Sequence, residues 1–315
     1  MKDSGAREPV EAVVPGSLSD AERARLEDMA YEIRRLTIEL VSWAQWGHIA
    51  GSTSMAEILA ALFFREARLD PANPRWDDRD RIILSKAHTS PGLYAAMALR
   101  GFFPVDDLYE YCDIDGILEG HSDMTRTPGL ESSSGLLGMG LSVAQGHAFA
   151  LRIRGQSGPL VFAILGDGEL NEGNIWEAAM SAGHYGLANL VAIVDHNRIM
   201  SKGFVEDLLS IEPLADKWRA FGWDVIELDG HDLDAVVAAL GAARLPARTR
   251  PLVLIANTIK GKGLAGFESS HRWHTHAPDP ATADELLRGL ARMYGRPETG
   301  YSRKDLPVKK EEFRV

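Results

Sequence analysis

Apolar residues recur at two different spacings along the chain, and these spacings predict its helices and strands. Ser19 and Glu22 form a capping-box pattern, and the apolar residues after them recur every three or four positions, which predicts a helix to about Trp46. Shorter apolar runs bounded by turn-forming residues predict strands. These strand segments are 80–85, 159–165, 189–195, 223–228 and 251–257.

Helical patterns alternate with most of these strands, for example at 91–101 and 140–153, while 103–140 is rich in loop-forming residues. Strands that are apolar on both faces and separated by helices indicate an α/β fold, a parallel sheet with helices on both faces. We expect a flexible N-terminal arm, an α/β domain, and a C-terminal helix with a charged tail. Their predicted bounds are 1–18, 19–285 and 286–315.

Composition narrows the class of protein. With 315 residues, 45% of them hydrophobic, the chain can bury a sizeable core. Its 34 basic residues against 45 acidic ones give a net charge of −11, which argues against a nucleic-acid partner. Cys112 is the only cysteine, so an internal disulfide is excluded. No apolar run reaches the roughly 18 residues of a membrane span, and no signal pattern is present, so we expect a cytoplasmic protein without a membrane partner.

Polar residues follow two neighbouring predicted strands. The strand at 159–165 runs into Asp167, and the strand at 189–195 is followed by Asn197, 30 positions later. Ligands of open parallel sheets bind beyond the carboxyl ends of the strands. The two polar side chains are therefore predicted to lie together at a ligand-binding edge.

The chemistry of this edge suits a metal-bound phosphate. Asp167 supplies a carboxylate oxygen, Asn197 an amide oxygen, and Ile199 a backbone carbonyl, a set of oxygens that suits Mg²⁺ sharing its shell with phosphate and water. Gly166 and Gly168 allow a sharp turn that brings backbone N–H groups close to phosphate oxygens. A glycine-flanked aspartate alone is weak evidence, but its conjunction with the spacing to Asn197 is specific.

Six separated stretches, in order, resemble the N-terminal, diphosphate-binding half of transketolase. The resemblance covers roughly residues 20–280, and the last two regions are most similar to bacterial transketolases made as two separate chains. The stretches are WGHIAGSTSMAEILAALFF, DRIILSKAHTSPGLYAAMALRG, LEGHSDMTRTPGLESSSGLLGMGLSVAQGHA, GDGELNEGNIWEAAMSAGHYGLANLVAIVDHNRI, EPLADKWRAFGWDVIELDGHD, and IKGKG with WHTHAPD. Read alone, KGKG (260–263) could equally be a solvated basic turn.

The resemblance implies thiamine diphosphate as cofactor, held with Mg²⁺ or another divalent cation such as Ca²⁺ or Mn²⁺. In this family, residues at the positions of Asp167, Asn197 and the Ile199 carbonyl bind the metal, and those at Gly168 and Asn197 touch the diphosphate. The loop formed by Gly135, Leu136 and Leu137 is implied to lie along the cofactor.

The resemblance also assigns roles to four histidines, all candidate catalytic residues. His88 and His274 match histidines near the diphosphate and the reacting centre, and His48 and His121 match histidines that line the substrate channel. Glu172 matches a glutamate at the interface between the two cofactor sites. The other histidines are expected at the surface or satisfied in the core: His147, His184, His196, His231 and His271.

Transketolases transfer a two-carbon ketol unit from a ketose or ketose phosphate to an aldose acceptor. The residues after about 280 form one short helix and a charged tail, too little for the domain that binds the cofactor's pyrimidine ring. The resemblance therefore implies a separate C-terminal, pyrimidine-binding transketolase subunit, in an α2β2 complex, with sugars or sugar phosphates as substrates. Three alternatives stay open: half of a 1-deoxyxylulose-5-phosphate synthase-like enzyme, half of a 2-oxo acid dehydrogenase-type enzyme, and a non-catalytic scaffold subunit.

Some residues depart from the family's pattern. Trp46 stands where a small residue is usual, and Met139 where a glutamine is common. Ala87 replaces a glycine, and His276 a lysine. None of these departures removes a metal ligand, but the first two bring the usual preference for sugar phosphates into question.

Overall fold

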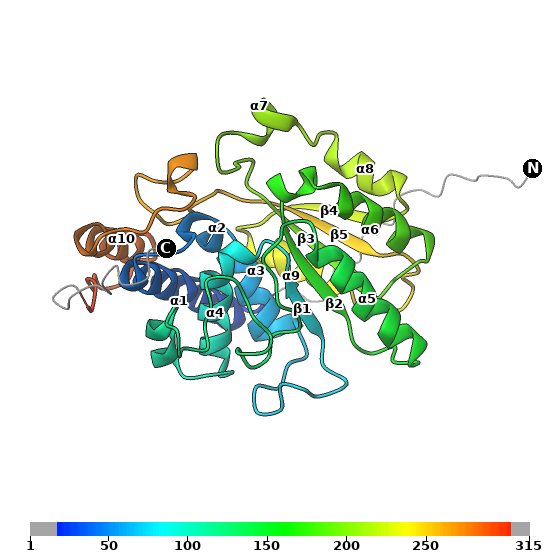
Figure 1. Ribbon diagram of the computed structural model, residues 1–315, viewed down its shortest axis with the longest axis horizontal. Coiled ribbons are helices and arrows are strands. Elements are labelled where there is room, and N and C mark those ends of the chain that lie inside the picture. The colour runs from blue at the N-terminus through cyan, green and yellow to red at the C-terminus, as the bar shows by residue number, and fades with distance from the viewer. Residues whose placement is uncertain (1–17, 304–315) are drawn as a thin grey trace, which may run out of the picture.

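The structure, a computed structural model that describes residues 18–303, is built on a five-stranded parallel sheet (Figure 1). The strands lie in the order β1-β2-β3-β5-β4. Their bounds are β1 Arg81–Leu84, β2 Val161–Gly166, β3 Leu190–His196, β4 Asp224–Asp229 and β5 Leu252–Asn257. The predicted α/β fold with a parallel sheet is confirmed, and each strand begins and ends within two residues of its predicted segment.

Helices connect these strands. The α-helices of the described residues are α1 Asp20–Ala44, α2 Ile49–Thr53, α3 Ala56–Ala61, α4 Ser90–Arg100, α5 Gly140–Ile153, α6 Gly173–His184, α7 Val205–Leu209, α8 Leu214–Ala220, α9 Leu233–Ala242 and α10 Pro280–Met293. A π-helical turn at Leu62–Glu66 extends α3, and short 3₁₀-helices occur at Ala87–Thr89, Val105–Glu110, Gly168–Asn171 and His271–Trp273. Apart from the second of these 3₁₀-helices, the region 103–139 consists of loops and turns, as predicted.

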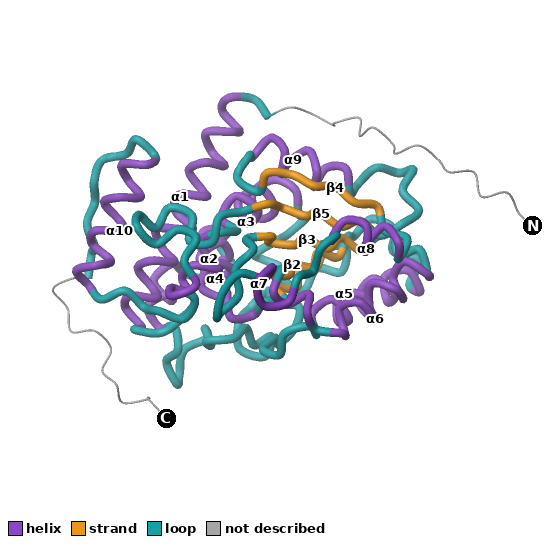
Figure 2. Tube along the Cα trace, turned by 90° about the horizontal axis from the view of Figure 1, so that it is seen from above, coloured by secondary structure: helices purple, strands orange, loops and turns teal. Residues whose placement is uncertain are grey.

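The helices cover both faces of the sheet. Figure 1 shows α5 and α6 on one side and α1, α3 and α4 on the other, and Figure 2 shows α9 opposite α5 and α6. Alternate residues of β2 belong to two different hydrophobic clusters, Phe162 and Ile164 to the one and Ala163 and Leu165 to the other. Because successive side chains of a strand point to opposite faces, a strand covered on both sides needs the continuous apolar run that the sequence shows.

The strand β4, which pairs only with β5, is one of the two edge strands and differs in burial from the other edge strand, β1. Its side chains are half-buried or exposed, with Glu227 and Asp229 among them, whereas those of β1 and β3 are buried throughout. The apolar run at 223–228 predicted this strand, but its position at the edge depends on the topology.

Two local features set the beginning and the end of α1, and the turn after its end leads toward the ligand-binding edge. The capping box is confirmed: Glu22 N donates to Ser19 Oγ at 3.3 Å, and Ser19 N donates to Glu22 Oε2 at 3.1 Å. The helix ends at Ala44, two residues before the predicted end, because Gln45 adopts a left-handed conformation with φ of 52°. The chain then turns, so that His48 precedes α2.

The strands β2 and β3 run in register, with Gly166 opposite Asp195. Asp167 and Asn197 therefore leave the same edge of the sheet on adjacent strands, as predicted. The predicted domain boundary at 285 falls inside α10 and stays a prediction, and residues 1–17 of the predicted arm and 304–315 of the tail lie outside the described residues. Between residues 18 and 303, no helix is both long and apolar enough to span a membrane.

Candidate functional site

A cavity of about 290 Å³ lies at the carboxyl edge of the sheet and brings together most of the predicted site residues. Its lining comes from the ends of β2 and β3, the loop before α2, the turn after β1 and the segment after β5. The predicted residues that line it are His48, His88, His121, Gly135, Leu137, Asp167, Gly168, Asn197, Ile199 and His274. Residues separated by more than 200 positions in the chain thus form one site.

The three predicted metal ligands lie next to one another. The Asp167 carboxylate accepts backbone hydrogen bonds from Gly168 N, at 2.7 Å, and from Arg198 N. Asn197 Oδ1 accepts from Ile199 N at 3.1 Å, which fixes the turn that presents the Ile199 carbonyl. One carboxylate, one amide and one carbonyl oxygen therefore line the same part of the cavity.

This donor set fits a divalent cation. Asp167 is 2% exposed, and burial together with the nearby Asp195 raises the pKa of its carboxyl to about 7. The positive charges of the protein alone therefore do not offset the negative charge of the ionised carboxylate. Among residues 18–303, no cluster of three histidine, cysteine or acidic side chains is placed to hold a metal. A metal at this edge would therefore depend on Asp167, the neutral oxygens, and ligands from phosphate or water.

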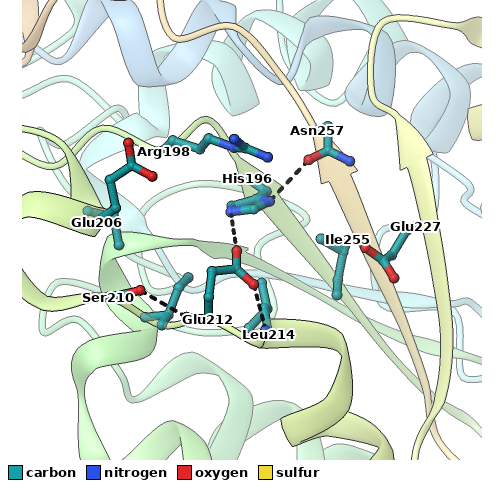
Figure 3. Close-up of a pocket in the computed structure, with 11 residues that line it drawn as sticks. His196, Arg198, Glu206, Ser210, Glu212, Leu214, Glu227, Ile255 and Asn257 are labelled. Atoms are coloured by element: carbon teal, nitrogen blue, oxygen red, sulfur yellow. Dashed lines mark hydrogen bonds and ion pairs between the residues drawn. The ribbon is translucent and has the colours of Figure 1, made fainter.

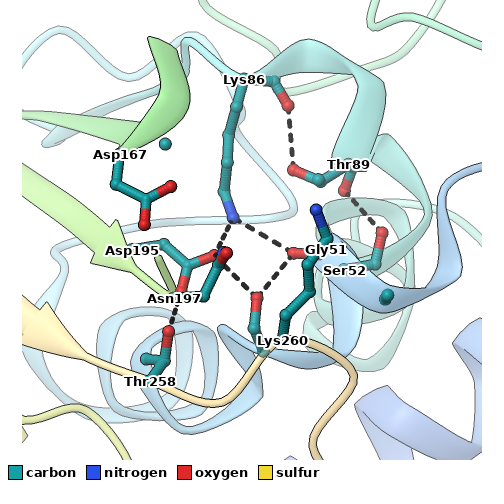
Figure 4. A network of polar contacts seen from close by, with 12 residues as sticks. Gly51, Ser52, Lys86, Thr89, Asp167, Asp195, Asn197, Thr258 and Lys260 are labelled. Carbon is teal, nitrogen blue, oxygen red and sulfur yellow. Dashed lines mark hydrogen bonds and ion pairs between the residues drawn. The ribbon is translucent and has the colours of Figure 1, made fainter. Parts of the chain in front are cut away.

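A buried ion pair stands behind these ligands (Figure 4). Lys86 Nζ donates to Asp195 Oδ2 and to the carbonyl of Gly51, the latter at 3.1 Å. Asp195 Oδ2 also accepts from Ser54 Oγ at 2.7 Å and from Asn197 Nδ2 at 3.1 Å. Burial alone would raise the pKa of Asp195, but Lys86 and these donors hold it below its usual value. The network orients the Asn197 amide, leaving its oxygen on the side of the Ile199 turn.

Lys260 is a site residue that the sequence did not identify. Its side chain is 2% exposed and lines the cavity, and its Nζ lies 3.0 Å from His274 Nδ1. The interpretation of KGKG as a solvated basic turn is thus wrong for Lys260, although Lys262 is only half-buried. The two glycines of KGKG were the sequence sign of an ordered turn. In the structure Gly261 and Gly263 have φ of 78° and 87°, a conformation that favours glycine.

Three of the four predicted histidines form a cluster. The ring centroids of His48, His88 and His274 lie 4.9, 5.1 and 5.2 Å apart in pairs, and His121 lines the same cavity. Burial, reinforced by neighbouring positive groups, lowers the pKa of His48 to about 4, of His88 to about 2 and of His274 to about 3. The three rings are therefore neutral near pH 7, and each can both accept and donate a hydrogen bond.

Two predicted site residues do not line the cavity. Leu136 is 73% exposed, while its neighbours Gly135 and Leu137 face the site. Glu172 is exposed at the start of α6 and packs beside Gly138, where an added Cβ would lie 2.6 Å from the Glu172 Cβ. Leu136 and Glu172 are thus accessible to another chain.

Trp46 and Met139, the two departures from the family's pattern that bear on substrate preference, both have exposed side chains. Trp46 is 58% exposed and lies against Gly120, where an added Cβ would be 3.2 Å from the indole Nε1. Gly120 precedes His121, which lines the cavity, so the indole contacts the segment next to a lining residue, although Trp46 itself does not line the cavity. Met139 is exposed and receives a hydrogen bond to its Sδ from Asn174 Nδ2 at 3.5 Å, away from the lining residues. Trp46 is therefore the departure closer to bound substrate.

A second cavity, of about 320 Å³, contains none of the predicted site residues (Figure 3). His196 lies in its wall, with Nδ1 3.2 Å from Asn257 Oδ1 and Nε2 3.6 Å from a Glu212 oxygen. Burial lowers the pKa of His196. This agrees with the prediction that His196 is a satisfied core histidine, and the cavity is separate from the candidate site.

A parallel sheet with glycine turns, oxygen donors and histidines at its carboxyl edge defines this chain as an α/β protein built to bind a diphosphate ligand. The family model of the transketolase thiamine diphosphate-binding domain matches residues 26–295. The chain belongs to the transketolase family. The predictions of a transketolase subunit, of transferase class, that binds thiamine diphosphate are confirmed.

Individual relatives support this assignment. The 6-deoxy-6-sulfo-D-fructose transketolase subunit SqwG of Clostridium sp. (strain MSTE9) is 44% identical over 249 residues, 79% of this chain and 90% of that protein. An apulose-4-phosphate transketolase subunit of Actinobacillus succinogenes is 40% identical over 266 residues, 84% of this chain and 95% of that protein. The crystal structure of transketolase from Campylobacter jejuni superposes with a TM-score of 0.81 at 29% identity, over 88% of this chain but only 44% of that one.

Proposed function

We propose that this chain is the diphosphate-binding subunit of a two-chain transketolase, which transfers a two-carbon ketol unit from a ketose to an aldose acceptor. The single observation that carries the proposal is the cavity at the carboxyl edge of the sheet. It combines the oxygen donors of Asp167, Asn197 and Ile199 with a cluster of neutral histidines. A site for diphosphate and a site for proton transfer thus adjoin each other.

The residues divide into two groups. Asp167, Asn197 and the Ile199 carbonyl would hold Mg²⁺, and Gly168 N would approach the diphosphate without steric obstruction from a side chain. When bound, thiamine diphosphate supplies the carbanion and the electron sink for cleaving the bond next to the ketose carbonyl. The protein's own contribution is placement, exclusion of water and the handling of protons.

The neutral histidines are suited to hydrogen-bonding oxygens that change charge. Alkoxide oxygens form and collapse during ketol transfer, and a neutral imidazole can donate a hydrogen bond to such an oxygen or accept one from the hydroxyl. His88 and His274 are proposed to act near the reacting centre, since both are buried in the cluster. His48 and His121 are proposed to hydrogen-bond the sugar hydroxyls at the channel.

We further propose a pyrimidine-binding partner subunit, in an α2β2 complex with the cofactors at the interfaces. The chain spans less than half the length of the solved transketolases that it resembles, whereas two relatives that it covers almost entirely are named as subunits. Glu172, exposed beside Gly138, is proposed to lie where the two cofactor sites communicate.

We propose an anionic ketose as the donor. One relative is named for a sulfonated ketose and another for a sugar phosphate, and both of these substrates carry an anionic group. Trp46, which contacts Gly120 next to His121, would narrow the approach to the cavity compared with the small residue usual at this position.

The test is ketol transfer by the purified chain with thiamine diphosphate and Mg²⁺, with and without a co-expressed pyrimidine-binding transketolase subunit. Turnover is expected only with both chains, with sulfonated and phosphorylated ketoses as the panel of donors. Robust turnover by this chain alone would refute the two-chain proposal. Absence of ketol transfer from the folded, cofactor-loaded complex with every donor would refute the transketolase activity.

A further inference from the structure

A third and larger cleft lies at the opposite edge of the sheet from the candidate active site. Its volume is about 700 Å³, and it is formed by the segments that precede β1, β2, β3 and β5. Lining residues come from 155–160, 186–189 and 243–248, together with Arg68 and Arg152. These are the amino ends of the strands, whereas Asp167 and Asn197 lie at the carboxyl ends.

The charge of this cleft is opposite to that of the chain as a whole. Four arginines line it, Arg68, Arg152, Arg244 and Arg248, and none of the lining residues is acidic. The net charge of the whole chain is −11. A concentration of guanidinium groups in an acidic protein favours an anionic ligand at this place.

Two of these arginines, Arg68 and Arg152, form no ion pair among the described residues. Arg244 forms one with the buried Asp80, and Arg248 a long one, of 4.0 Å, with Asp224. Arg152 donates to the Tyr185 carbonyl at 2.6 Å and lies over the Phe149 ring. Within residues 18–303, the Arg68 side chain has neither an ion pair nor a hydrogen bond. It lies 5.2 Å over the Trp76 ring, a position that holds the guanidinium without neutralising its charge.

Arg248 is the most constrained of the four. Its side chain is only 10% exposed, and within the described residues its Nε has no hydrogen-bond partner. Its terminal nitrogens donate to the carbonyls of Ala243 and Arg250, at 2.8 and 2.7 Å. The nearest carboxylate oxygen, Asp224 Oδ2, is 4.0 Å from Nε, and burial lowers the pKa of Arg248 to about 10. A buried cation with a weak counter-charge would be stabilised by a bound anion.

The shape of the cleft suits a ligand with two parts. Between the arginines lies an apolar surface that includes Leu160, Leu245 and Pro246. Gly158 adjoins Arg68: an added Cβ would lie 3.0 Å from the Arg68 Nη1, so glycine leaves the guanidinium free to approach a ligand. Guanidinium forks match phosphate oxygens in geometry as well as charge.

We propose that this arginine cleft binds a phosphorylated small molecule, with its phosphate or diphosphate group on Arg68, Arg152 and Arg248 and its organic part on the apolar surface. The site is independent of the cofactor site, because the full length of β2 and β3 separates the two. It therefore goes beyond the proposed transketolase activity and does not depend on it.

The test is calorimetric titration of the full chain with inorganic pyrophosphate in the presence of EDTA and without thiamine diphosphate, so that the metal-dependent cofactor site stays empty and no free Mg²⁺ complexes the pyrophosphate. Arg68→Gln and Arg152→Gln each remove one exposed guanidinium of the cleft. Each is expected to weaken binding about tenfold or more, the loss of one charge-assisted hydrogen bond. The matched control Arg292→Gln, on the exposed face of α10, makes the same charge change elsewhere and should leave the affinity unchanged.

Because Arg68 and Arg152 are exposed, both variants should stay folded, which the thermal melting temperature without ligand will verify. Pyrophosphate should raise the melting temperature of the wild-type chain more than that of either variant. Absence of pyrophosphate binding to the wild-type chain would overturn the proposal. An equal loss of pyrophosphate affinity in all three variants would also overturn it, because that result would indicate general electrostatic attraction to the surface. Unchanged affinity in both cleft variants would overturn it as well.

Discussion

The ammonium group of Lys260 lies 2.8 Å from the carbonyl oxygen of Ile199, the backbone group assigned to the metal by resemblance. The same Nζ is 3.3 Å from the Met200 carbonyl and 3.0 Å from His274 Nδ1. Burial lowers the pKa of Lys260 to about 8, against the opposing effect of Asp167 and Asp195, so the side chain is largely charged at pH 7. Lys260 thus ties the metal-binding turn to the histidine cluster.

Replacing Lys260 by methionine should lower the affinity for thiamine diphosphate about tenfold or more. The change removes a buried cation next to the proposed diphosphate site while keeping a side chain of similar length, and one hydrogen bond to a charged group contributes roughly 1.5–3 kcal/mol. Calorimetry on the two-chain complex measures the effect. Lys262→Met is the matched control in the same turn, and an equal loss in both variants would show that the turn, rather than the Lys260 charge, matters.

Asp167→Asn is expected to abolish Mg²⁺-dependent cofactor binding, because Asp167 is the only charged group among the proposed metal ligands. Both oxygens of the Asp167 carboxylate accept backbone hydrogen bonds, from Gly168 N and Arg198 N, and an amide NH₂ group can accept neither, so the melting temperature of the free chain is expected to fall. Thermal melting with and without Mg²⁺ and thiamine diphosphate separates the two effects. A variant that unfolds at lower temperature without ligands, yet still gains stability from them, would mean that the metal lies elsewhere.

The sequence predicted the sheet well, because strands buried on both faces require uninterrupted apolar runs. It also located Asp167 and Asn197, since both stand directly after such runs, where topology brings strand ends together. The pairing of Lys86 with Asp195 was not predictable in this way. The two residues are 109 positions apart, and neither lies at a spacing that distinguishes it from an ordinary surface charge.

Two further features, the end of α1 and the arginine cleft, could not be predicted from local sequence patterns. The helix α1 ends before Trp46 because Gln45 is left-handed, a conformation that helical periodicity does not reveal. The arginine cleft gathers Arg68 and Arg248 from two loops and Arg152 from the last turn of α5, far apart in the chain. Such a cluster exists only after the strands have been ordered, so sequence order alone contains no sign of it.

Alanine substitution of His48 or His121 should reduce ketol transfer while leaving the affinity for thiamine diphosphate nearly unchanged. Both residues line the cavity, but neither belongs to the proposed metal or diphosphate ligands. Loss of one hydrogen bond to a sugar hydroxyl is expected to cost roughly 0.5–1.5 kcal/mol, or about two- to tenfold in the rate of ketol transfer. Steady-state kinetics with the complete complex, together with cofactor titration, provide the measurement.

His184→Ala is the control for these two variants, since His184 is exposed on α6 outside the cavity. It should retain wild-type turnover. If His48→Ala or His121→Ala lowers the melting temperature strongly in the free chain, that histidine is structural, and its assignment to the substrate channel would be wrong.

A buried ion pair supports the segment that carries Lys260, and it makes stability depend on pH. Arg34 forms two hydrogen bonds to the Glu57 carboxylate, at 2.5 and 2.6 Å, and its Nε donates to the Lys262 carbonyl at 3.0 Å. His231 lies 3.0 Å from Glu57 Oε2 and accepts from Ile259 N at 2.8 Å. Arg34 and His231 thus hold the turn from both sides.

Burial alone would raise the pKa of Glu57, but Arg34 and His231 lower it to about 2. In the unfolded chain the carboxyl titrates near its ordinary value of about 4.3. The ionised Glu57 therefore contributes stability that is fully present above the unfolded pKa and is lost as the pH falls toward 2. Glu57→Gln should cost about 3–5 kcal/mol at pH 7, because it leaves the Arg34 guanidinium buried without its counter-charge.

Denaturant unfolding of the wild-type chain and of Glu57→Gln, at pH 7 and at about pH 3, measures this contribution. The difference in free energy of unfolding should be largest at pH 7 and should shrink at the lower pH, where the wild-type chain must take up the proton on unfolding. Glu27→Gln, an exposed change on α1, should show no such difference. The double variant Arg34→Met/Glu57→Leu removes both charges and should recover much of the lost stability, since paired apolar side chains need no compensation. An equal gap between wild type and Glu57→Gln at both pH values would contradict the lowered pKa of Glu57 and leave packing as the cause of its effect.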